Sequence, residues 1–333
     1  MVQRSLIFSL LLSLPLIWSG CDNEIDLLDD YREIPVIYGL VNPASTTHQI
    51  RVQRAFLGEG NALLMAQYPD SSYYDTASVR LTIEKIVANQ SSQLGTFYPY
   101  YGLSKDEGLF TDQNHYVFRL DNYRLQEDEN VRYRLKFENL ATGKIVTAET
   151  RVIRDILQGT LSSTTRVNLA STNPYNIRIT TPRYGRQFGM IMRIRYTEKK
   201  KITQITTSKY LDLTFPPLLS RTQNGGEELI FLVDGKKVFQ FLGQKIKTDT
   251  TVVRRLQDFK ADYLFTAVTE DFFNYVQVNA PSNAVNFIPE FTNLSDGKGL
   301  FTCRLDTVIP NIIFNEATYD SLANGTYTRH IFQ

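Results

Sequence analysis

The stretch Val131-Arg-Tyr-Arg-Leu-Lys-Phe-Glu138 decides the fold class, because apolar and charged residues alternate along it without interruption. Successive side chains of a strand point to opposite faces, so this alternation predicts a strand with one face in a core and one in water. A turn follows at 139–143, and the run 144–153 again places apolar or β-branched residues at every second position. The sequence therefore predicts a β-hairpin over 131–153.

Runs of similar length and period lie on both sides of this hairpin, and few segments have helical periodicity. Short strands separated by turns are typical of β-sandwiches. We therefore expect a mostly-β protein built of two β-sandwich domains of immunoglobulin or transthyretin-like type. The expected strands are 34–41, 48–56, 77–87 and 115–120 before the hairpin, and 176–181, 188–198, 201–213 and 261–268 after it.

The domain boundary is expected where the composition changes after the hairpin. The segment 154–176 is rich in Ser and Thr and contains Ala170-Ser-Thr-Asn-Pro174, a composition typical of a linker. The predicted organisation is a signal peptide at 1–20, an acidic tether at 21–33, an N-terminal β-sandwich at 34–153, a linker at 154–176 and a C-terminal β-rich domain at 177–333.

Two further features are expected in the C-terminal domain. Phe231–Phe239 is interpreted as a second hairpin, because Asp234-Gly235 supplies the positive φ that a tight turn needs. One short helix is predicted at 269–279, where Thr269 offers an N-cap, apolar residues follow at spacings of three and four, and Pro281 ends the run.

The N-terminus has the pattern of an export signal. Arg4 precedes a largely apolar run at 6–18, and the small residues Ser19 and Gly20 stand before Cys21. The run is shorter than the roughly 20 apolar residues that span a bilayer. A Cys at the cut resembles a bacterial lipoprotein signal, in which that Cys carries the lipid; an ordinary signal, cleaved or retained, is the alternative. The acidic residues that follow predict a solvated tether.

Composition limits the classes of function. The chain has 36 Lys and Arg against 35 Asp and Glu, and loss of Arg4 with the signal leaves 35 of each, so the mature chain is formally neutral. Nucleic-acid binding depends on neutralising phosphates, so we expect no nucleic-acid partner. The chain has 2 Cys. If Cys21 is lipidated, Cys303 has no disulfide partner and is expected to be a small buried residue.

No constellation of catalytic residues is recognisable. His48, His115 and His330 are far apart in the sequence and are interpreted as strand-end or surface residues. No nucleophile elbow, phosphate loop or dinucleotide-binding motif occurs, and no ligands recur at the spacing of a metal site. The densest carboxylate cluster after the tether, Glu127-Asp128-Glu129, is expected in an exposed loop. We therefore predict no catalytic residue, no metal site and no cofactor.

Aromatic residues are the better candidates for a binding surface. They gather in two stretches, 68–74 and 97–101, which Pro and Ser interrupt, so both are expected to be irregular. Tyr combines stacking area with a hydroxyl and is enriched at binding surfaces. The alternative is that these side chains close the ends of the first sandwich. Lys199-Lys200-Lys201 and Arg254-Arg255 are expected only as a solvated turn and a strand end. The candidate binding residues are Tyr68, Tyr73, Tyr74, Phe97, Tyr98, Tyr100 and Tyr101.

Several of these pieces, taken in order, resemble a family of Bacteroidota outer-membrane lipoproteins. This is a domain family of unknown function, often encoded beside TonB-dependent receptors. The resemblance covers nearly the whole mature chain, and an ending with Asn293, Gly297, Gly299 and Phe301 is its most distinctive part. The matching pieces are Cys21 followed by Glu24-Ile25-Asp26, the strand at 34–41, Tyr133–Phe137, the strand and helix at 262–279, and the stretch Thr292–Phe301.

The resemblance implies a lipid-anchored, two-part, β-rich protein of the outer membrane that faces the cell exterior, and it implies no reaction. We expect a non-catalytic accessory or ligand-binding partner of a TonB-dependent transporter, attached to the membrane through lipid on Cys21. The alternative is a secreted surface hydrolase of glycans or peptides with an unrecognised site. Acidic residues lining one cleft would favour the hydrolase, and a shallow aromatic surface would favour binding.

Overall fold

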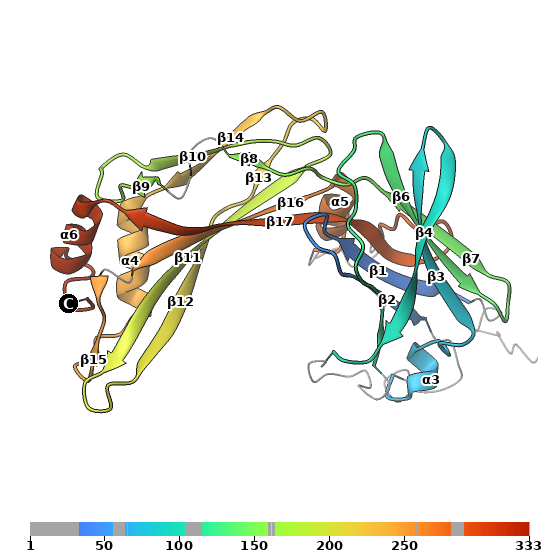
Figure 1. Cartoon of the computed structure of the whole chain (residues 1–333), viewed down its shortest axis with the longest axis horizontal. Helices are drawn as coiled ribbons and strands as arrows, with labels where there is room; N and C mark the ends of the chain where they lie inside the picture. The colour runs from blue at the N-terminus through green and yellow to red at the C-terminus, as the bar shows by residue number, and fades with distance from the viewer. Residues whose placement is uncertain are drawn as a thin grey trace, which may run out of the picture. The chain divides into compact units, whose positions relative to one another are not determined.

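The computed structural model describes residues 33–55, 64, 66–103, 115–158, 161, 164–256, 259–280 and 290–332. Strands make up most of the regular structure (Figure 1), which confirms the mostly-β class. Residues 34–333 form one compact unit. The signal peptide, Cys21 and the tether up to residue 32 lie outside the described residues, so lipidation stays a prediction.

In the first half of the chain, the described residues form antiparallel strands and one single-turn helix. The hairpin predicted at 131–153 is confirmed: its strands pair from Glu138↔Ile145 to Tyr133↔Thr150, and the side chains of Tyr133 and Phe137 are fully buried. The elements are β1 Pro35–Val41, β2 His48–Arg54, α3 Pro69–Ser72, β3 Val79–Val87, β4 Gln90–Tyr100, β5 Val117–Leu120, β6 Val131–Asn139 and β7 Ile145–Thr150.

The second half contains a long antiparallel sheet, a small second sheet and three helices among its described residues. The elements are β8 Leu157–Gln158, β9 Arg166–Val167, β10 Tyr175–Thr180, β11 Gln187–Lys200, β12 Thr206–Thr214, β13 Leu218–Leu219, β14 Glu228–Val233, α4 Gly235–Lys245, β15 Val252–Val253, β16 Lys260–Val268, α5 Glu270–Val278, β17 Lys298–Phe314 and α6 Glu316–Asn324.

Most strands belong to one path of hydrogen-bonded neighbours, in the order β12-β11-β16-β17-β1-β2-β5-β4-β3-β6-β7. Strands β14, β10 and β8 form the separate small sheet. The buried side chains of this small sheet, such as Ile177 and Phe231, face the long sheet, where the Phe231 ring contacts Phe265 of β16 at a centroid distance of 6.2 Å. Two sheets therefore enclose the core of the second half.

Strand β17 joins the two halves. Its first part pairs in parallel with β1, from Val36↔Lys298 to Val41↔Cys303, and its later part pairs antiparallel with β16. Figure 1 shows it as one long strand that runs between the two groups of strands. The boundary predicted at 154–176 stays a prediction, but that segment buries Ile156, Val167 and Leu169, and a cut there would leave the halves connected through β17.

The distinctive ending at 293–301 has a structural role. Asn293 Nδ2 donates to the Phe301 carbonyl at 2.7 Å, and Asn293 Oδ1 accepts from the Phe301 amide at 3.0 Å. Gly299 has φ +115°, and a Cβ there would lie 2.1 Å from the carbonyl oxygen of Ile37. Only glycine fits this approach of two backbones, so the motif sets the parallel pairing of β17 with β1.

The hairpin interpretation of Phe231–Phe239 was wrong. Strand β14 ends at Val233, and Asp234 is the N-cap of α4, where its side chain accepts hydrogen bonds from the amides of Lys236 and Lys237. Asp followed by Gly suits a helix start as well as a tight turn, and here burial decided, because Val238 and Leu242 share the buried face of the helix. Helices α4 and α6 were both missed.

The helix predicted at 269–279 is confirmed as α5. Thr269 is its N-cap, and the Thr269 hydroxyl accepts a hydrogen bond from the Phe272 amide. Glu270 and Asp271 stand in the first turn, where their charges interact favourably with the helix dipole.

Cys303 is fully buried, as expected, and burial raises the pKa of its thiol to about 12. His48 opens β2, as predicted, but His48 and His115 are both buried and so are not surface residues, whereas His330 is exposed. His48 Nε2 lies 3.0 Å from the Tyr123 carbonyl oxygen, which identifies Nε2 as the protonated nitrogen. Burial lowers the pKa of His48, against the opposing effect of this hydrogen bond.

Candidate functional site

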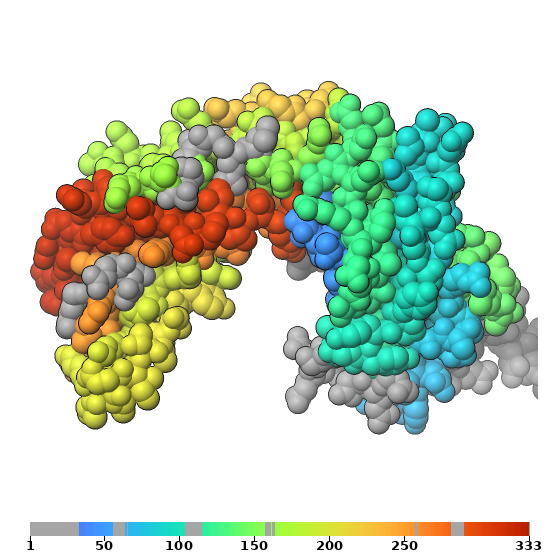
Figure 2. All heavy atoms as spheres, in the orientation of Figure 1, coloured from blue at the N-terminus to red at the C-terminus, as the bar shows by residue number. Residues whose placement is uncertain are grey.

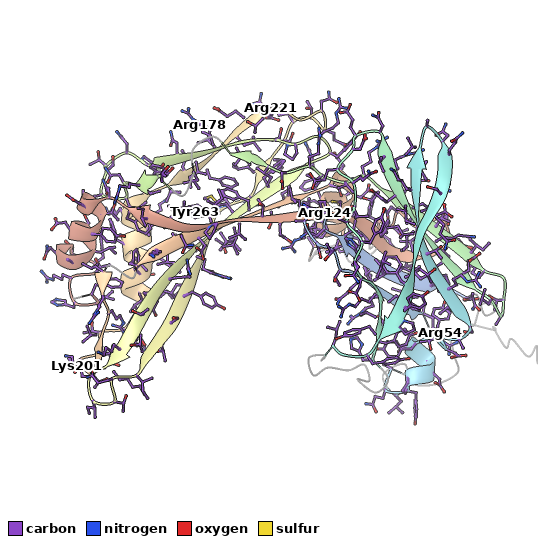
Figure 3. The ribbon with its side chains drawn as sticks, in the orientation of Figure 1. Arg54, Arg124, Arg178, Lys201, Arg221 and Tyr263 are labelled. Carbon is purple, nitrogen blue, oxygen red and sulfur yellow. The ribbon has the colours of Figure 1, made fainter. Side chains whose placement is uncertain are left out.

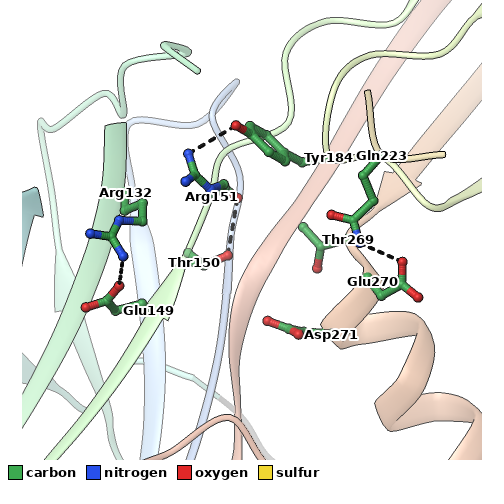
Figure 4. Close-up of a pocket in the computed structure, with 9 residues that line it drawn as sticks. All are labelled: Arg132, Glu149, Thr150, Arg151, Tyr184, Gln223, Thr269, Glu270 and Asp271. Atoms are coloured by element: carbon green, nitrogen blue, oxygen red, sulfur yellow. Dashed lines mark hydrogen bonds and ion pairs between the residues drawn. The ribbon is translucent and has the colours of Figure 1, made fainter. Parts of the chain in front are cut away.

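A polar hollow of about 280 Å³ lies between the hairpin β6–β7 and the N-terminus of α5 (Figure 4). It combines basic, acidic and hydroxyl side chains from segments far apart in the sequence. The residues that line it are Arg132, Glu149, Thr150, Arg151, Tyr184, Gln223, Thr269, Glu270 and Asp271.

On one wall of the hollow, Glu149 of β7 is held by two arginines of β6. Arg132 Nη1 donates to its Oε2 at 3.0 Å, and Arg134 Nη2 donates to its Oε1 at 2.6 Å. Positions 132 and 134 alternate with the buried residues of β6, so both guanidinium groups lie on the outer face beside the facing strand. The Glu149 charge is thus already balanced within the chain.

Above this wall, Arg151 packs on Tyr184. The guanidinium carbon lies 4.8 Å from the centre of the Tyr184 ring, and Nη1 donates to the Tyr184 hydroxyl at 3.0 Å and to the Glu129 carbonyl at 2.8 Å. Tyr184 has φ +67°, a left-handed conformation that is costly for a bulky residue. Its backbone is held there by a hydrogen bond from the Tyr184 amide to the Gln223 carbonyl.

The opposite wall is the first turn of α5. Glu270 Oε2 accepts a hydrogen bond from Gln223 Nε2 at 2.7 Å and lies 3.8 Å from Arg186 Nε. Asn293 Nδ2 lies 3.3 Å from Asp271 Oδ2. Burial raises the pKa of Asp271, the Asn293 hydrogen bond partly opposes the shift, and the neighbouring Glu270 charge adds to it.

The hollow therefore contains three carboxylates, and each has a hydrogen-bond donor from the chain. A ligand entering it would compete with these internal pairs, which limits the affinity that the hollow offers. Asp271 is the carboxyl group of the hollow whose pKa is raised toward neutral pH, so it is the candidate for any proton transfer. No group of His, Cys, Asp and Glu within the described ranges is arranged to hold a metal ion.

The predicted aromatic residues do not form one exposed surface, because some of them are buried and others are exposed. Tyr73, Tyr74 and Phe97 are buried, so they present no broad exposed surface, and Tyr100 is half-buried under Arg119. The exposed members are Tyr68, Tyr98 and Tyr101, at 65%, 69% and 58%.

The second aromatic stretch was also wrongly predicted as irregular, because Phe97 to Tyr100 belong to β4. Pro99 is tolerated there because this part of β4 has left β3 and pairs with β5 alone.

The first aromatic stretch does form a cavity, which we call the aromatic hollow. It measures about 470 Å³. Tyr116 connects several of its lining residues: its ring contacts Tyr73 at 5.5 Å and Tyr101 at 5.6 Å, and its hydroxyl donates to the Tyr74 carbonyl at 2.7 Å. The lining residues are Pro69, Asp70, Tyr73, Tyr74, Asp75, Thr76, Tyr101 and Tyr116.

Sequence reasoning missed Tyr116 and the two aspartates of this cavity. Tyr116 is buried, and burial, together with the neighbouring Tyr101 and Tyr73, raises its pKa far above the ordinary value, so its hydroxyl stays neutral. Tyr116 stands in the run predicted as a strand at 115–120, and no local pattern links it to Tyr73. Asp70 and Asp75 bracket Tyr73 and Tyr74 in the sequence, which is the signal that was available.

Comparisons with known proteins place the chain in no family. No family model matches it, and no curated protein matches it. Among solved structures, the C-terminal globular domain of an oligosaccharyltransferase from Pyrococcus abyssi shares 8% identity at a TM-score of 0.25, over 70% of this chain and 47% of that chain. CBD12 from CALX1.2 shares 9% identity at a TM-score of 0.15, over 84% of this chain and 100% of that one.

These likenesses are too weak to carry an argument about fold or function. Within the part of the chain that the structure describes, no helix is long and apolar enough to cross a membrane.

Proposed function

We propose that this protein is a lipid-anchored protein of the outer membrane, facing the cell exterior, that binds its ligand without transforming it, as an accessory partner of a TonB-dependent transporter. Support for the anchor is the signal pattern that ends at Cys21. The observation that carries the binding role is the aromatic hollow, with exposed Tyr101 at its edge.

The chemistry of the aromatic hollow suits a cationic or amphipathic group. Tyr rings present a negative face that attracts an ammonium or guanidinium group, and Asp70 and Asp75 add carboxylates to the lining. The buried rings of Tyr73 and Tyr116 are held by packing, so they lose little freedom when a ligand binds. A lysine or arginine side chain of the transporter fits these requirements.

The test is binding of a purified TonB-dependent transporter from the same organism, the class of partner that the proposal names. We expect Tyr101→Ala to weaken binding by about 2 kcal/mol, roughly thirtyfold, as for a hot-spot aromatic residue. Tyr210→Ala is the matched control, because Tyr210 is 59% exposed but lies on β12. Tyr73→Ala is a poor test, since loss of a buried ring perturbs folding. Equal binding by the Tyr101 and Tyr210 variants would contradict the assignment of the aromatic hollow as the contact.

A second candidate, a surface hydrolase of glycans or peptides, is favoured by one observation: Glu149, Glu270 and Asp271 line the same polar hollow. A glycosidase needs two carboxylates, one of them with a raised pKa. Asp271→Asn is the decisive variant for this candidate. Hydrolysis of a glycan or peptide library by the wild type, abolished in Asp271→Asn, would replace the binding proposal.

A further inference from the structure

The hairpin β11–β12 ends in a segment that the proposed function does not use. We call residues 199–205 the basic hairpin end; Figure 3 labels Lys201 within it. Ile202 is 91% exposed and Ile205 is 58% exposed. Single exposed apolar residues are ordinary on a protein surface, but here two lie in one turn directly after three lysines. Charge and apolar surface are thus concentrated at one point.

The backbone of the basic hairpin end is held in place by strands on both sides. Lys199 pairs with Thr206 of β12 on one side and with Val253 of β15 on the other. The Lys201 amide donates to the Thr251 carbonyl at 2.8 Å, and the Gln204 amide donates to the Lys200 carbonyl at 2.9 Å. Folding has already ordered this turn, so a partner that meets it bears little further entropic cost.

No carboxylate of the described residues forms an ion pair with Lys200 or Lys201 at this end, and the side chains of both lysines are exposed. Glu198 is the nearest carboxylate on β11, and it is taken up by Arg254 and Lys209. In the loop before β15, Asp249 accepts hydrogen bonds from the amide and hydroxyl of Thr251.

The narrow shape of this region suits contact with a deformable lipid surface better than contact with a folded protein. Figure 2 shows the hairpin, in yellow, as a projection at the lower left of the molecule. A stable protein interface buries on the order of 1,000 Å² or more, which calls for a broad complementary surface. A lipid surface instead deforms around a narrow projection, takes up apolar side chains between its head groups, and attracts lysines when it is anionic.

We propose that the basic hairpin end binds an anionic membrane surface, with Lys200 and Lys201 at lipid phosphates and Ile202 immersed below them. The proposal does not depend on the aromatic hollow, on a transporter or on lipidation of Cys21. It gives the second half of the chain a membrane contact of its own.

The first test is sedimentation with vesicles, using the mature chain with Cys21→Ser so that no anchor contributes. Vesicles of phosphatidylcholine mixed with phosphatidylglycerol should bind the protein, and vesicles of phosphatidylcholine alone should not. Each lysine contributes about fivefold to such binding, so Lys200→Ser with Lys201→Ser should weaken it about thirtyfold. Lys236→Ser with Lys237→Ser, on the exposed first turn of α4, is the control for charge.

The second test measures insertion. The only Trp of the chain is Trp18, in the signal, so the mature protein has none, and Ile202→Trp creates a single reporter. Its emission should shift to the blue on anionic vesicles and lose that shift at about 1 M salt, where screening is nearly complete. Leu232→Trp is the matched control, because Leu232 is 59% exposed on β14.

Two results would overturn the proposal. One is equal sedimentation of the Lys200/Lys201 and Lys236/Lys237 variants with anionic vesicles. The other is an emission wavelength of the Ile202→Trp variant that is the same with and without anionic vesicles. Either would direct the search to an acidic protein partner that binds the same lysines.

Discussion

Two carboxylates in this protein have the same kinds of partner but differ in burial. Glu198 of β11 accepts from Arg254 at 2.8 Å and from Lys209 at 2.6 Å, and its side chain and that of Arg254 are 11% and 6% exposed. Glu149 of β7 accepts from Arg132 and Arg134, and all three side chains are about one-third exposed. Each carboxylate has two ionic partners, so the number of ion pairs does not separate them. We expect the contribution to the free energy of unfolding to follow burial instead, because water screens exposed charges.

Burial also changes the electrostatics of the Glu198 cluster. Burial alone would raise the pKa of Glu198, but the hydrogen bonds from Lys209 and Arg254 outweigh it and hold the pKa below its ordinary value. Arg254 Nη1 also approaches the Ile331 carbonyl, which links the cluster to the C-terminal turn. Arg254 directly follows β15, so the prediction of a strand end at Arg254-Arg255 was correct, but it missed the burial of Arg254 and its ion pair with Glu198, while Arg255 is exposed.

The largest effect is expected for Arg254→Met, which leaves Glu198 buried with Lys209 as its remaining ionic partner. Breaking a buried ion pair on one side costs about 3–5 kcal/mol. Urea unfolding should show this loss as a lower midpoint. Arg255→Met is the matched control, and it should change the free energy of unfolding by less than about 0.5 kcal/mol. Similar losses of unfolding free energy in the two variants would mean that the burial of Arg254 does not make its ion pair more stabilising.

Replacing both partners tests whether the cost comes from the orphaned charge. We expect Glu198→Leu combined with Arg254→Met to recover most of the stability lost in Arg254→Met, because apolar residues of similar volume often replace buried ion pairs without loss. The same unfolding experiment, completed as a double-mutant cycle, measures the coupling. A double variant as unstable as the single one would assign the loss to packing.

His48 extends the comparison to a buried group that forms no ion pair with any residue that the structure describes. Its folded pKa lies below 6.5, so between that pKa and pH 6.5 the unfolded chain binds more protons. Stability should therefore fall as the pH drops below 6.5, by at most about 1.4 kcal/mol per pH unit from this group. The difference in unfolding free energy between wild type and His48→Gln should narrow over this range. A difference independent of pH would contradict the prediction.

The smallest effect is expected for Glu149→Gln. Its ion pairs with Arg132 and Arg134 are open to water, and such pairs contribute about 0–1 kcal/mol. The loss should shrink further at high salt, because ions screen exposed charges. A loss as large as that of Arg254→Met would show that the polar hollow is less hydrated than its exposure indicates.

Local sequence patterns predicted the elements whose residues fit only one kind of secondary structure. The alternation at 131–138 produced β6, and the cap at Thr269 produced the start of α5. The failure at Asp234-Gly235 has a clear cause. That dipeptide suits both a turn and a helix start, and burial of Val238 and Leu242 on one face of α4, with Gly235 close to the Leu169 backbone, selects the helix. No local pattern contains that contact.

The candidate sites were predicted less well than the strands. Composition located the aromatic stretches, but burial divided them, leaving Tyr101 exposed and Phe97 in the core. The polar hollow was not predicted, because its walls come from β6–β7 and from α5, which are distant in the sequence. The lysines at 199–201 were predicted as a solvated turn, but Lys199 and Lys200 belong to β11 and the turn begins at Lys201. That prediction also left out the apolar Ile202, which completes the basic hairpin end.

The sequence by itself determined the mostly-β class, the β6–β7 hairpin and helix α5, because periodicity and capping act between residues a few positions apart. Only the tertiary structure decided which aromatic and basic side chains outside that hairpin are buried, how β17 joins the two halves, and which charges are left exposed. Those outcomes depend on long-range pairing and on the removal of water, and neither is recorded in the order of neighbouring residues.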